Sequence, residues 1–355
     1  MVKNPVRSEG DAFLRACRGE PAAHTPVWFM RQAGRSQPSY RRLRETHTLM
    51  EIVRDPRLAA GVTVSPVEDL GVDAAILFSD IMVPLEPMGV AFEIREGVGP
   101  IVADPIRTAA QVARLVELDP ARDVPYVLEA VERAAASLAV PVIGFAGAPF
   151  TLACYLVEGG PSRGYIEVKR FMWSQPDVFR ALMEHLTRNM QAYLAAQAAA
   201  GARALQVFDS WVGALAPDDY EAHVAPHMAR LFAGLRHVPT LAFGVGTSGL
   251  IEAIARTGPA VVGLDWRVDL AVARDRLGAD RPVQGNLDPA VLLAPWARVA
   301  EAARGVLARN GARPGHIFNL GHGVLPETDP AQLQRLVALV HEETRAATHE
   351  GEQTS

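Results

Sequence analysis

The stretch Pro26-Val27-Trp28-Phe29-Met30-Arg31-Gln32-Ala33-Gly34-Arg35 joins two segments that need opposite surroundings. Its first half, residues 26–30, is bulky and apolar and predicts a buried strand. Its second half places two guanidinium groups around Gly34, a residue that can adopt a positive φ and turn the chain sharply. Arginine donates bidentate hydrogen bonds to carboxylates and phosphates. We therefore expect Arg31 and Arg35 to form an anion-binding loop at the end of a buried strand. The basic residues that follow are expected to form a solvated face; they are Arg41, Arg42 and Arg44.

The composition indicates a large globular chain rather than a nucleic-acid-binding, membrane or disulfide-rich protein. The chain has 355 residues, 49% of them hydrophobic, and a net charge of -5. Its two cysteines, Cys17 and Cys154, are too few and too far apart for a disulfide framework or a thiolate zinc site. Residues 1–10 carry charges and a proline where a signal peptide needs an apolar core, so we expect a soluble, cytoplasmic protein.

Apolar segments that predict strands alternate with segments that predict helices. The eight expected strands are 26–30, 73–78, 141–146, 204–208, 240–245, 261–264, 282–284 and 316–320. Helices are expected between and after them, among them 39–45, 56–70, 108–117, 124–138, a short one that begins at Pro149, 176–200 and 217–235. Residues 90–102 predict a small hairpin excursion after the second strand.

This alternation predicts an α/β fold with parallel strands and right-handed crossovers. Eight units favour a single closed (β/α)₈ TIM barrel. An open doubly wound sheet is the alternative, but no glycine-rich GxGxxG motif follows the first strand. We expect residues 11–345 to form this one domain, preceded by a flexible N-terminus, 1–10, and followed by a disordered polar tail, 346–355.

Polar residues follow several of the expected strands, and the carboxyl ends of barrel strands are where such folds carry out chemistry. Besides the arginine loop, they are Asp80, Tyr155, Ser210 and His322. Each has a purely structural alternative: the aspartate and the serine could cap turns, the tyrosine could be a core residue, and the histidine could lie in an inert loop. Because all fall at one face of the predicted fold, we expect a site for a polyanion that also carries a donor group.

Several motifs, spread in order along nearly the whole chain, resemble those of the uroporphyrinogen decarboxylase family. They are residues 26–35, Phe78-Ser-Asp80-Ile81, Gly147-Ala-Pro-Phe-Thr-Leu152, Tyr155-Leu-Val-Glu-Gly-Gly160, Phe208-Asp-Ser210, Gln284-Gly-Asn-Leu-Asp-Pro289 and Asn319-Leu-Gly-His-Gly323. The resemblance implies a single TIM barrel that works as a homodimer without metal or cofactor. It also implies a carboxy-lyase of haem biosynthesis that converts the acetate side chains of uroporphyrinogen III to methyl groups, giving coproporphyrinogen III.

The resemblance further implies the roles of individual residues. Asp80, Arg31 and Tyr155 would be catalytic: the aspartate would stabilise a cationic pyrrole, the arginine would lie near the reacting acetate, and the tyrosine would orient the aspartate by a hydrogen bond. The substrate would be bound by Arg31, Gln32, Ala33, Gly34, Arg35, Asp80, Tyr155, Ser210 and His322. One departure is Ser36-Gln37-Pro38-Ser39, where the family commonly has Tyr-Leu-Pro-Glu. It concerns the packing of the loop, because every polar residue just named is present.

Two other functions are compatible with a barrel of this kind. A zinc-dependent methyltransferase acting with a corrinoid or a thiol needs imidazole and thiolate ligands, typically His-x-Cys with a second cysteine. The fifth expected strand ends instead in Phe243-Gly-Val-Gly246, which offers no such ligand. A non-catalytic tetrapyrrole carrier would keep the same pocket, although the retention of Asp80 with both arginines favours an enzyme.

Overall fold

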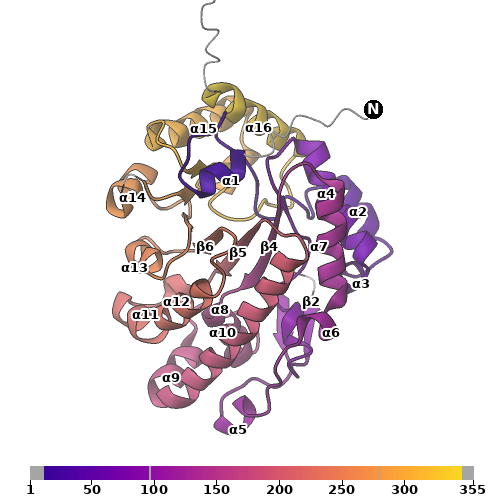
Figure 1. The fold of residues 1–355 in the computed structure, drawn as a ribbon, viewed down its shortest axis with the longest axis vertical. Helices are drawn as coiled ribbons and strands as arrows, with labels where there is room; N and C mark the ends of the chain where they lie inside the picture. The colour runs from indigo at the N-terminus through magenta and orange to yellow at the C-terminus, as the bar shows by residue number, and fades with distance from the viewer. Residues whose placement is uncertain (1–11, 96, 279, 346–355) are drawn as a thin grey trace, which may run out of the picture.

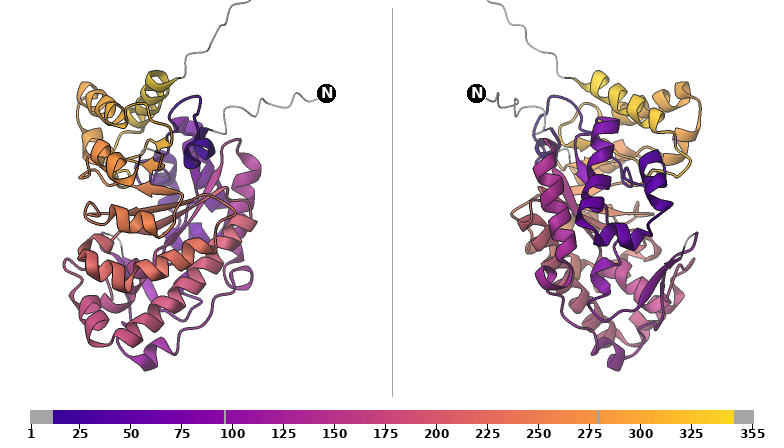
Figure 2. Two further views of the ribbon diagram at one scale, coloured as in Figure 1. Left: turned by 60° about the vertical axis from the view of Figure 1, so that its left-hand side comes forward. Right: turned by 90° about the vertical axis from the view of Figure 1, so that its right-hand side faces the viewer.

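Seven of the eight predicted strands form one parallel sheet in the computed structural model, which describes residues 12–95, 97–278 and 280–345 (Figure 1). The strands lie in the order β1-β4-β5-β6-β7-β8-β9, so each pairs with the next main-sheet strand along the chain. Their bounds are β1 (Ala75–Ile76), β4 (Val142–Gly147), β5 (Ala204–Asp209), β6 (Thr240–Gly244), β7 (Val261–Gly263), β8 (Val283–Gln284) and β9 (His316–Ile317). Figures 1 and 2 show the sheet curled, with helices around its outer side. The predicted parallel α/β fold is confirmed.

The helices follow the predicted alternation, and many of them begin at a proline, whose missing N–H has no helical partner at that position in any case. In the described part of the chain they are α1 (Ala12–Cys17), α2 (Pro38–Arg44), α3 (Leu49–Arg54), α4 (Pro56–Leu70), α5 (Ala109–Val112), α6 (Pro120–Asp123), α7 (Pro125–Ser137), α8 (Pro149–Glu158), α9 (Ile166–Ser174), α10 (Pro176–Ala199), α11 (Pro217–His223), α12 (Ala225–Ala233), α13 (Ile251–Arg256), α14 (Leu270–Leu277), α15 (Trp296–Asn310) and α16 (Pro330–Thr344), with 3-10 turns η1 (Val83–Leu85), η2 (Val212–Ala214) and η3 (Pro289–Leu293).

Two predicted helices are shorter than expected. The helix predicted over 217–235 is broken at Val224 into α11 and α12, because Pro226 in the first turn of α12 cannot donate the hydrogen bond that would continue α11. The helix predicted over 108–117 is reduced to the single turn α5, which Thr108 caps.

The hairpin predicted over 90–102 is confirmed. Strands β2 (Phe92–Arg95) and β3 (Gly99–Val102) pair antiparallel, with Phe92 opposite Val102. The termini predicted to be flexible, 1–10 and 346–355, lie outside the described residues. Within the described residues, no helix combines the length and the apolar composition needed to cross a bilayer.

The first predicted strand, 26–30, is not a regular strand, which corrects the expectation. It forms an isolated parallel bridge between Val27 and Phe318, just beyond β9. On its other side the Val27 carbonyl accepts the N–H of Asp73 at 2.8 Å, just before β1. The Val27 N–H donates to the Asp73 side chain at 2.7 Å, so the carboxylate takes the place of a backbone acceptor and no regular ladder forms. The segment nevertheless contacts both edges of the sheet.

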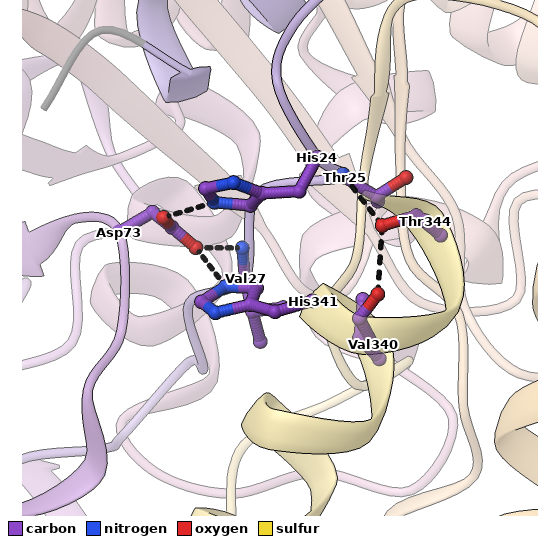
Figure 3. Close-up of polar contacts among 7 residues, drawn as sticks. All are labelled: His24, Thr25, Val27, Asp73, Val340, His341 and Thr344. Atoms are coloured by element: carbon purple, nitrogen blue, oxygen red, sulfur yellow. Dashed lines mark hydrogen bonds and ion pairs between the residues drawn. The ribbon is translucent and has the colours of Figure 1, made fainter. Parts of the chain in front are cut away.

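Asp73 is the buried centre of a cluster that joins distant parts of the chain (Figure 3). One carboxylate oxygen bonds His24 Nε2 at 2.7 Å, and the other bonds His341 Nε2 at 2.8 Å and the Val27 N–H. We call the three side chains of His24, Asp73 and His341 the Asp73 clasp. Because they come from the loop before residue 26, the loop just before β1 and the last turn of α16, they tie the early part of the described chain to its last helix.

The clasp has the side-chain types of a metal site, and its ligand atoms lie within 4.8 Å of one another. Its geometry is that of hydrogen bonds instead. Each histidine nitrogen lies 2.7 or 2.8 Å from a carboxylate oxygen, whereas two tetrahedral ligands of one zinc ion stand about 3.3 Å apart.

Three polar side chains meet inside the curled sheet. Trp28 Nε1 donates to Gln284 Oε1 at 2.9 Å, and Gln284 Nε2 donates to Gln206 Oε1 at 3.2 Å. All three residues are buried. Segment 26–30, β5 and β8 are therefore linked across the interior by satisfied polar groups, which a buried position requires.

Candidate active site

The arginine loop turns immediately after segment 26–30. Arg31 has a φ of 61°, a left-handed conformation that is uncommon outside glycine. Gln32 is fully buried, and its side chain accepts the Phe29 N–H at 2.9 Å and donates to the Ala74 carbonyl at 3.0 Å. The Gln32 side chain therefore holds the loop in place from within the fold. The two arginines on either side of it, Arg31 and Arg35, remain exposed, while Ala33 and Gly34 are half-buried.

The Arg31 side chain lies along Gly323, on the loop that follows β9. A Cβ at Gly323 would come within 2.5 Å of Arg31 Cδ, so a larger residue there would force the Arg31 side chain to shift. The adjacent His322 is half-buried, and its Nδ1 accepts the Gly323 N–H at 2.8 Å. Burial lowers the pKa of His322, and the charges of Arg31 and Arg267 lower it further. A neutral imidazole therefore lies beside two guanidinium groups.

Asp80 follows β1 and caps the turn after it, one of the two roles that the sequence allowed. Its Oδ1 accepts the Met82 N–H at 2.9 Å, which is the bond of a turn cap. Burial raises the pKa of Asp80, while the Met82 hydrogen bond and the charge of Arg31 oppose that increase. The carboxylate is thus half-buried, held by one backbone hydrogen bond, and near enough to Arg31 for the charge of that guanidinium to act on it.

Tyr155 lies on α8, close enough to Asp80 and Arg31 for their charges to act on its hydroxyl. Burial raises the pKa of Tyr155, the charge of Asp80 raises it further, and the charge of Arg31 opposes the increase. The described side chains of Tyr155 and Asp80 make no hydrogen bond to each other, so the predicted orienting bond is not formed in this arrangement. The structure thus gathers Arg31, Asp80, Tyr155 and His322 around one place.

Two predicted site residues lie at the margin of this group. Ser210 is half-buried at the end of β5, and Arg35 is exposed. The loop backbone at Arg35 is held by Arg41, whose Nη1 donates to the carbonyls of Arg35 at 3.0 Å and Ser36 at 2.9 Å. Arg41 was expected only to face solvent, so its role in bracing the arginine loop was missed. Its position six residues after Arg35 was the available signal.

The sequence reasoning also missed residues that surround the predicted site. Asp265 and Arg267 follow β7 and form an ion pair at 3.4 Å, and the Arg267 guanidinium lies 3.9 Å from the centre of the Trp266 ring. An acid and a base directly after a strand were the signal for this pair.

Asp209 is buried at the end of β5, where Thr151 donates its hydroxyl to Oδ1 at 2.7 Å. Burial raises the pKa of Asp209 to about 7, against the hydrogen bonds from Thr151.

The arrangement suits a polycarboxylate that develops positive charge. Arg31 and Arg267 can pair with acid groups, and the Asp80 carboxylate can stabilise a cation in a place of low dielectric. Among the described residues, the one group of three side chains with metal-ligating atoms close together is the Asp73 clasp, which lies at the opposite ends of the strands. Cys154 is buried, and burial raises the pKa of its thiol, so it is a poor ligand or nucleophile.

Solved structures resemble the fold at low sequence identity. A methyltransferase from Methanosarcina mazei matches with a TM-score of 0.73 and 20% identity, over 95% of this chain and 99% of the other. A putative vitamin-B12-independent methionine synthase from Listeria monocytogenes matches with a TM-score of 0.54 and 12% identity, over 92% of this chain and 97% of the other. These likenesses show the fold alone.

Sequence relatives identify the family. Residues 8–343 match the family described as uroporphyrinogen decarboxylase (URO-D). The uroporphyrinogen decarboxylase of Geobacillus kaustophilus is 52% identical over 342 residues, which cover 96% of this chain and 99% of the relative. That of Thermus thermophilus is 54% identical over 334 residues, which cover 94% of this chain and 98% of the relative. The chain therefore belongs to the uroporphyrinogen decarboxylase family.

Proposed function

We propose that this protein decarboxylates uroporphyrinogen III, converting its four acetate side chains to methyl groups and yielding coproporphyrinogen III in haem biosynthesis. The curated relatives carry the name of this carboxy-lyase along almost their whole length. The observation that carries the proposal is Asp80, a half-buried carboxylate that is held by the Met82 N–H at 2.9 Å and lies near Arg31 and Tyr155.

The chemistry needs a place for the electron pair that remains when carbon dioxide leaves. Protonation of a pyrrole ring carbon turns the ring into a cationic electron sink. The bond between the acetate methylene and its carboxylate then breaks, carbon dioxide leaves, and the electron pair neutralises the ring. Protonation of the resulting exocyclic carbon completes the methyl group, and loss of the ring proton restores the pyrrole. Asp80 stabilises the cationic ring and accepts hydrogen bonds from pyrrole N–H groups.

The other predicted residues hold the acid side chains. Arg31 and Arg35 bind carboxylates through bidentate hydrogen bonds, and Arg31, which is near Asp80, lies next to the reacting acetate. Ser210 and His322 bind further propionate or acetate groups, and Tyr155 adjusts the environment of Asp80. Gln32, Ala33 and Gly34 take part through the backbone of the loop, because the Gln32 side chain is engaged within the fold.

We also propose that residues 11–345 form one closed (β/α)₈ barrel that works as a homodimer. Segment 26–30, the first predicted strand, closes the barrel between the two edges of the seven-stranded sheet. It contacts Phe318 beyond β9 on one side and Asp73 before β1 on the other. The interior bond from Trp28 to Gln284 supports the same closure. Measuring the mass of the protein in solution by light scattering tests the dimer.

The test of function uses Asp80→Asn. Asparagine keeps an acceptor for the Met82 N–H, so the turn should lose no more than about 1 kcal/mol of stability. It removes the negative charge, so turnover of uroporphyrinogen III should fall on the order of 10²–10³-fold. The matched control is Asp55→Asn, because Asp55 Oδ1 also accepts an N–H two residues ahead, that of Arg57 at 2.8 Å, far from the site. Turnover of Asp80→Asn within a few-fold of the wild type would remove Asp80 from the mechanism. A wild-type chain that binds the substrate without turnover would indicate a carrier.

A further inference from the structure

Three aromatic rings line the side of the site on which Tyr155 lies. The Tyr155 and Trp211 ring centres are 3.9 Å apart at an interplanar angle of 39°, and the Tyr165 and Trp211 centres are 5.0 Å apart at 38°. All three rings are half-buried. The indole of Trp211 is therefore the surface against which the Tyr155 ring rests, and the direction of the Tyr155 hydroxyl depends on it.

The backbone of Trp211 is itself held in place. Its N–H donates to Thr151 Oγ1 at 3.3 Å. The Thr151 hydroxyl in turn donates a hydrogen bond to Asp209 Oδ1 at 2.7 Å. Thr151 is fully buried and Asp209 is 6% exposed, so water does not compete for these bonds. A hydroxyl has one proton to donate. Because Asp209 accepts that proton, an oxygen lone pair of Thr151 is left to face Trp211.

Helix α8 contacts Trp211 at two points. Thr151 and Tyr155 are four residues apart, so they lie on the same face of the helix, one turn from each other. Thr151 holds the backbone of Trp211 and Tyr155 packs on its ring. The end of β5 and helix α8 are thereby linked, and the ring of Tyr155 is held against the end of β5.

We propose that Trp211 is a positioning residue for decarboxylation: held by Thr151 and Asp209, it fixes the position of the Tyr155 ring in the site. The inference rests on the proposed function, because it assigns Trp211 a role in that same site. Burial of the Asp209 carboxylate is unfavourable. If Asp209 only capped α8, a neutral side chain would serve equally well. The place of Asp209 here is to orient Thr151, which in turn holds the backbone of Trp211.

The first test separates turnover from binding. Trp211→Leu should lower kcat about 10- to 100-fold, because a small misplacement of a group near the reacting atoms is enough for such a loss. It should change KM by less than about threefold, since the arginine loop is untouched. The matched control is Trp296→Leu in α15, a tryptophan whose ring contacts Arg335 on the outside of the fold.

The second test asks whether Trp211 acts through Tyr155. In Tyr155→Phe the hydroxyl is gone while the ring remains, so adding Trp211→Leu should lower kcat by less than about threefold. Full multiplication of the two single effects would overturn the proposal. Thr151→Val is nearly isosteric and replaces the hydroxyl by a methyl group, so it should lower kcat in the same way, and Thr151→Ser should restore it. Equal activities of Thr151→Val and the wild type would also overturn it.

A third measurement does not depend on turnover. The chain has six tyrosines, so a protein labelled with 3-fluorotyrosine gives a simple fluorine NMR spectrum in which Tyr155→Phe assigns the Tyr155 signal. Thr151→Val keeps every aromatic ring but should shift that signal, whereas Trp296→Leu should not. An unshifted signal in Thr151→Val refutes the positioning role. A wild-type chain without decarboxylase activity refutes the proposed function instead, and the NMR result then decides the role of Trp211 on its own.

Discussion

The Asp73 clasp allows a stability prediction that can be worked out bond by bond. Asp73 is 8% exposed and accepts from His24 at 2.7 Å, His341 at 2.8 Å and the Val27 N–H at 2.7 Å. Hydrogen bonds to a charged group each contribute roughly 1.5–3 kcal/mol, and a buried N–H left without an acceptor costs a further 1–3 kcal/mol or so. Neighbouring bonds are not additive, so we expect Asp73→Ala to lower the free energy of unfolding by about 3–5 kcal/mol.

The measurement is urea denaturation at neutral pH, followed by circular dichroism. The control is Asp69→Ala, an exposed aspartate four residues earlier, which should stay within about 0.5 kcal/mol of the wild type. His341→Ala should also destabilise the protein, because it removes the imidazole that joins α16 to the carboxylate. A loss below about 1 kcal/mol in Asp73→Ala would contradict the view that the clasp holds the early part of the described chain to its last helix.

The same variant has a defined pH dependence. Burial raises the pKa of Asp73, but the hydrogen bonds from His24 and His341 outweigh that effect, so the pKa lies below its ordinary value of 3.8. A carboxyl with a lowered pKa stabilises the folded state above its unfolded pKa, and that stabilisation is lost as the pH falls through the folded pKa. The stability gap between the wild type and Asp73→Ala should therefore be full at pH 5 to 7 and shrink below about pH 4. Because the clasp has hydrogen-bond distances, zinc or a chelator should leave the gap unchanged. A gap that appears only with zinc would make the clasp a metal site.

Three further predictions concern the arginine loop and the end of β5. Arg31→Ala should lower both kcat and substrate affinity and Arg35→Ala mainly affinity, in steady-state kinetics; equal and small changes would place the anion site elsewhere. Gly323→Ala should lower kcat about 10-fold or more with little change in melting temperature, because a Cβ would come within 2.5 Å of Arg31 Cδ and displace the guanidinium; unchanged kinetics would mean that the side chain relocates freely. Asp209 has a pKa raised to about 7 by burial, so its ionisation destabilises the folded state as the pH rises from its unfolded pKa to the folded one. Asp209→Asn cannot ionise, so its stability relative to the wild type should increase between about pH 4 and pH 8, by an amount on the order of 2–4 kcal/mol in urea denaturation; a constant difference would show that Asp209 does not titrate in this range.

Local sequence predicted the structure correctly where a short segment contains all the residues that decide its conformation. The starts of α4 and α8 at Pro56 and Pro149, the hairpin of β2 and β3, and the parallel pairing of the main sheet were all predicted. The helix broken at Val224 was not, because the apolar period continues through Pro226 while the hydrogen-bond ladder cannot.

Sequence by itself determined the α/β alternation, the family and the types of residue at the strand ends, because periodicity, turn chemistry and motif spacing are properties of short segments. The tertiary structure decided which of those residues meet. It brought Arg31 to Gly323, stacked Tyr155 on Trp211 and replaced a regular first strand by the bond from Val27 to the Asp73 carboxylate. His341 lies 268 residues from Asp73 in the chain, and no local pattern encodes a contact over such a separation. Such contacts depend on how helices and strands pack around the sheet, and that is settled only when the whole chain folds.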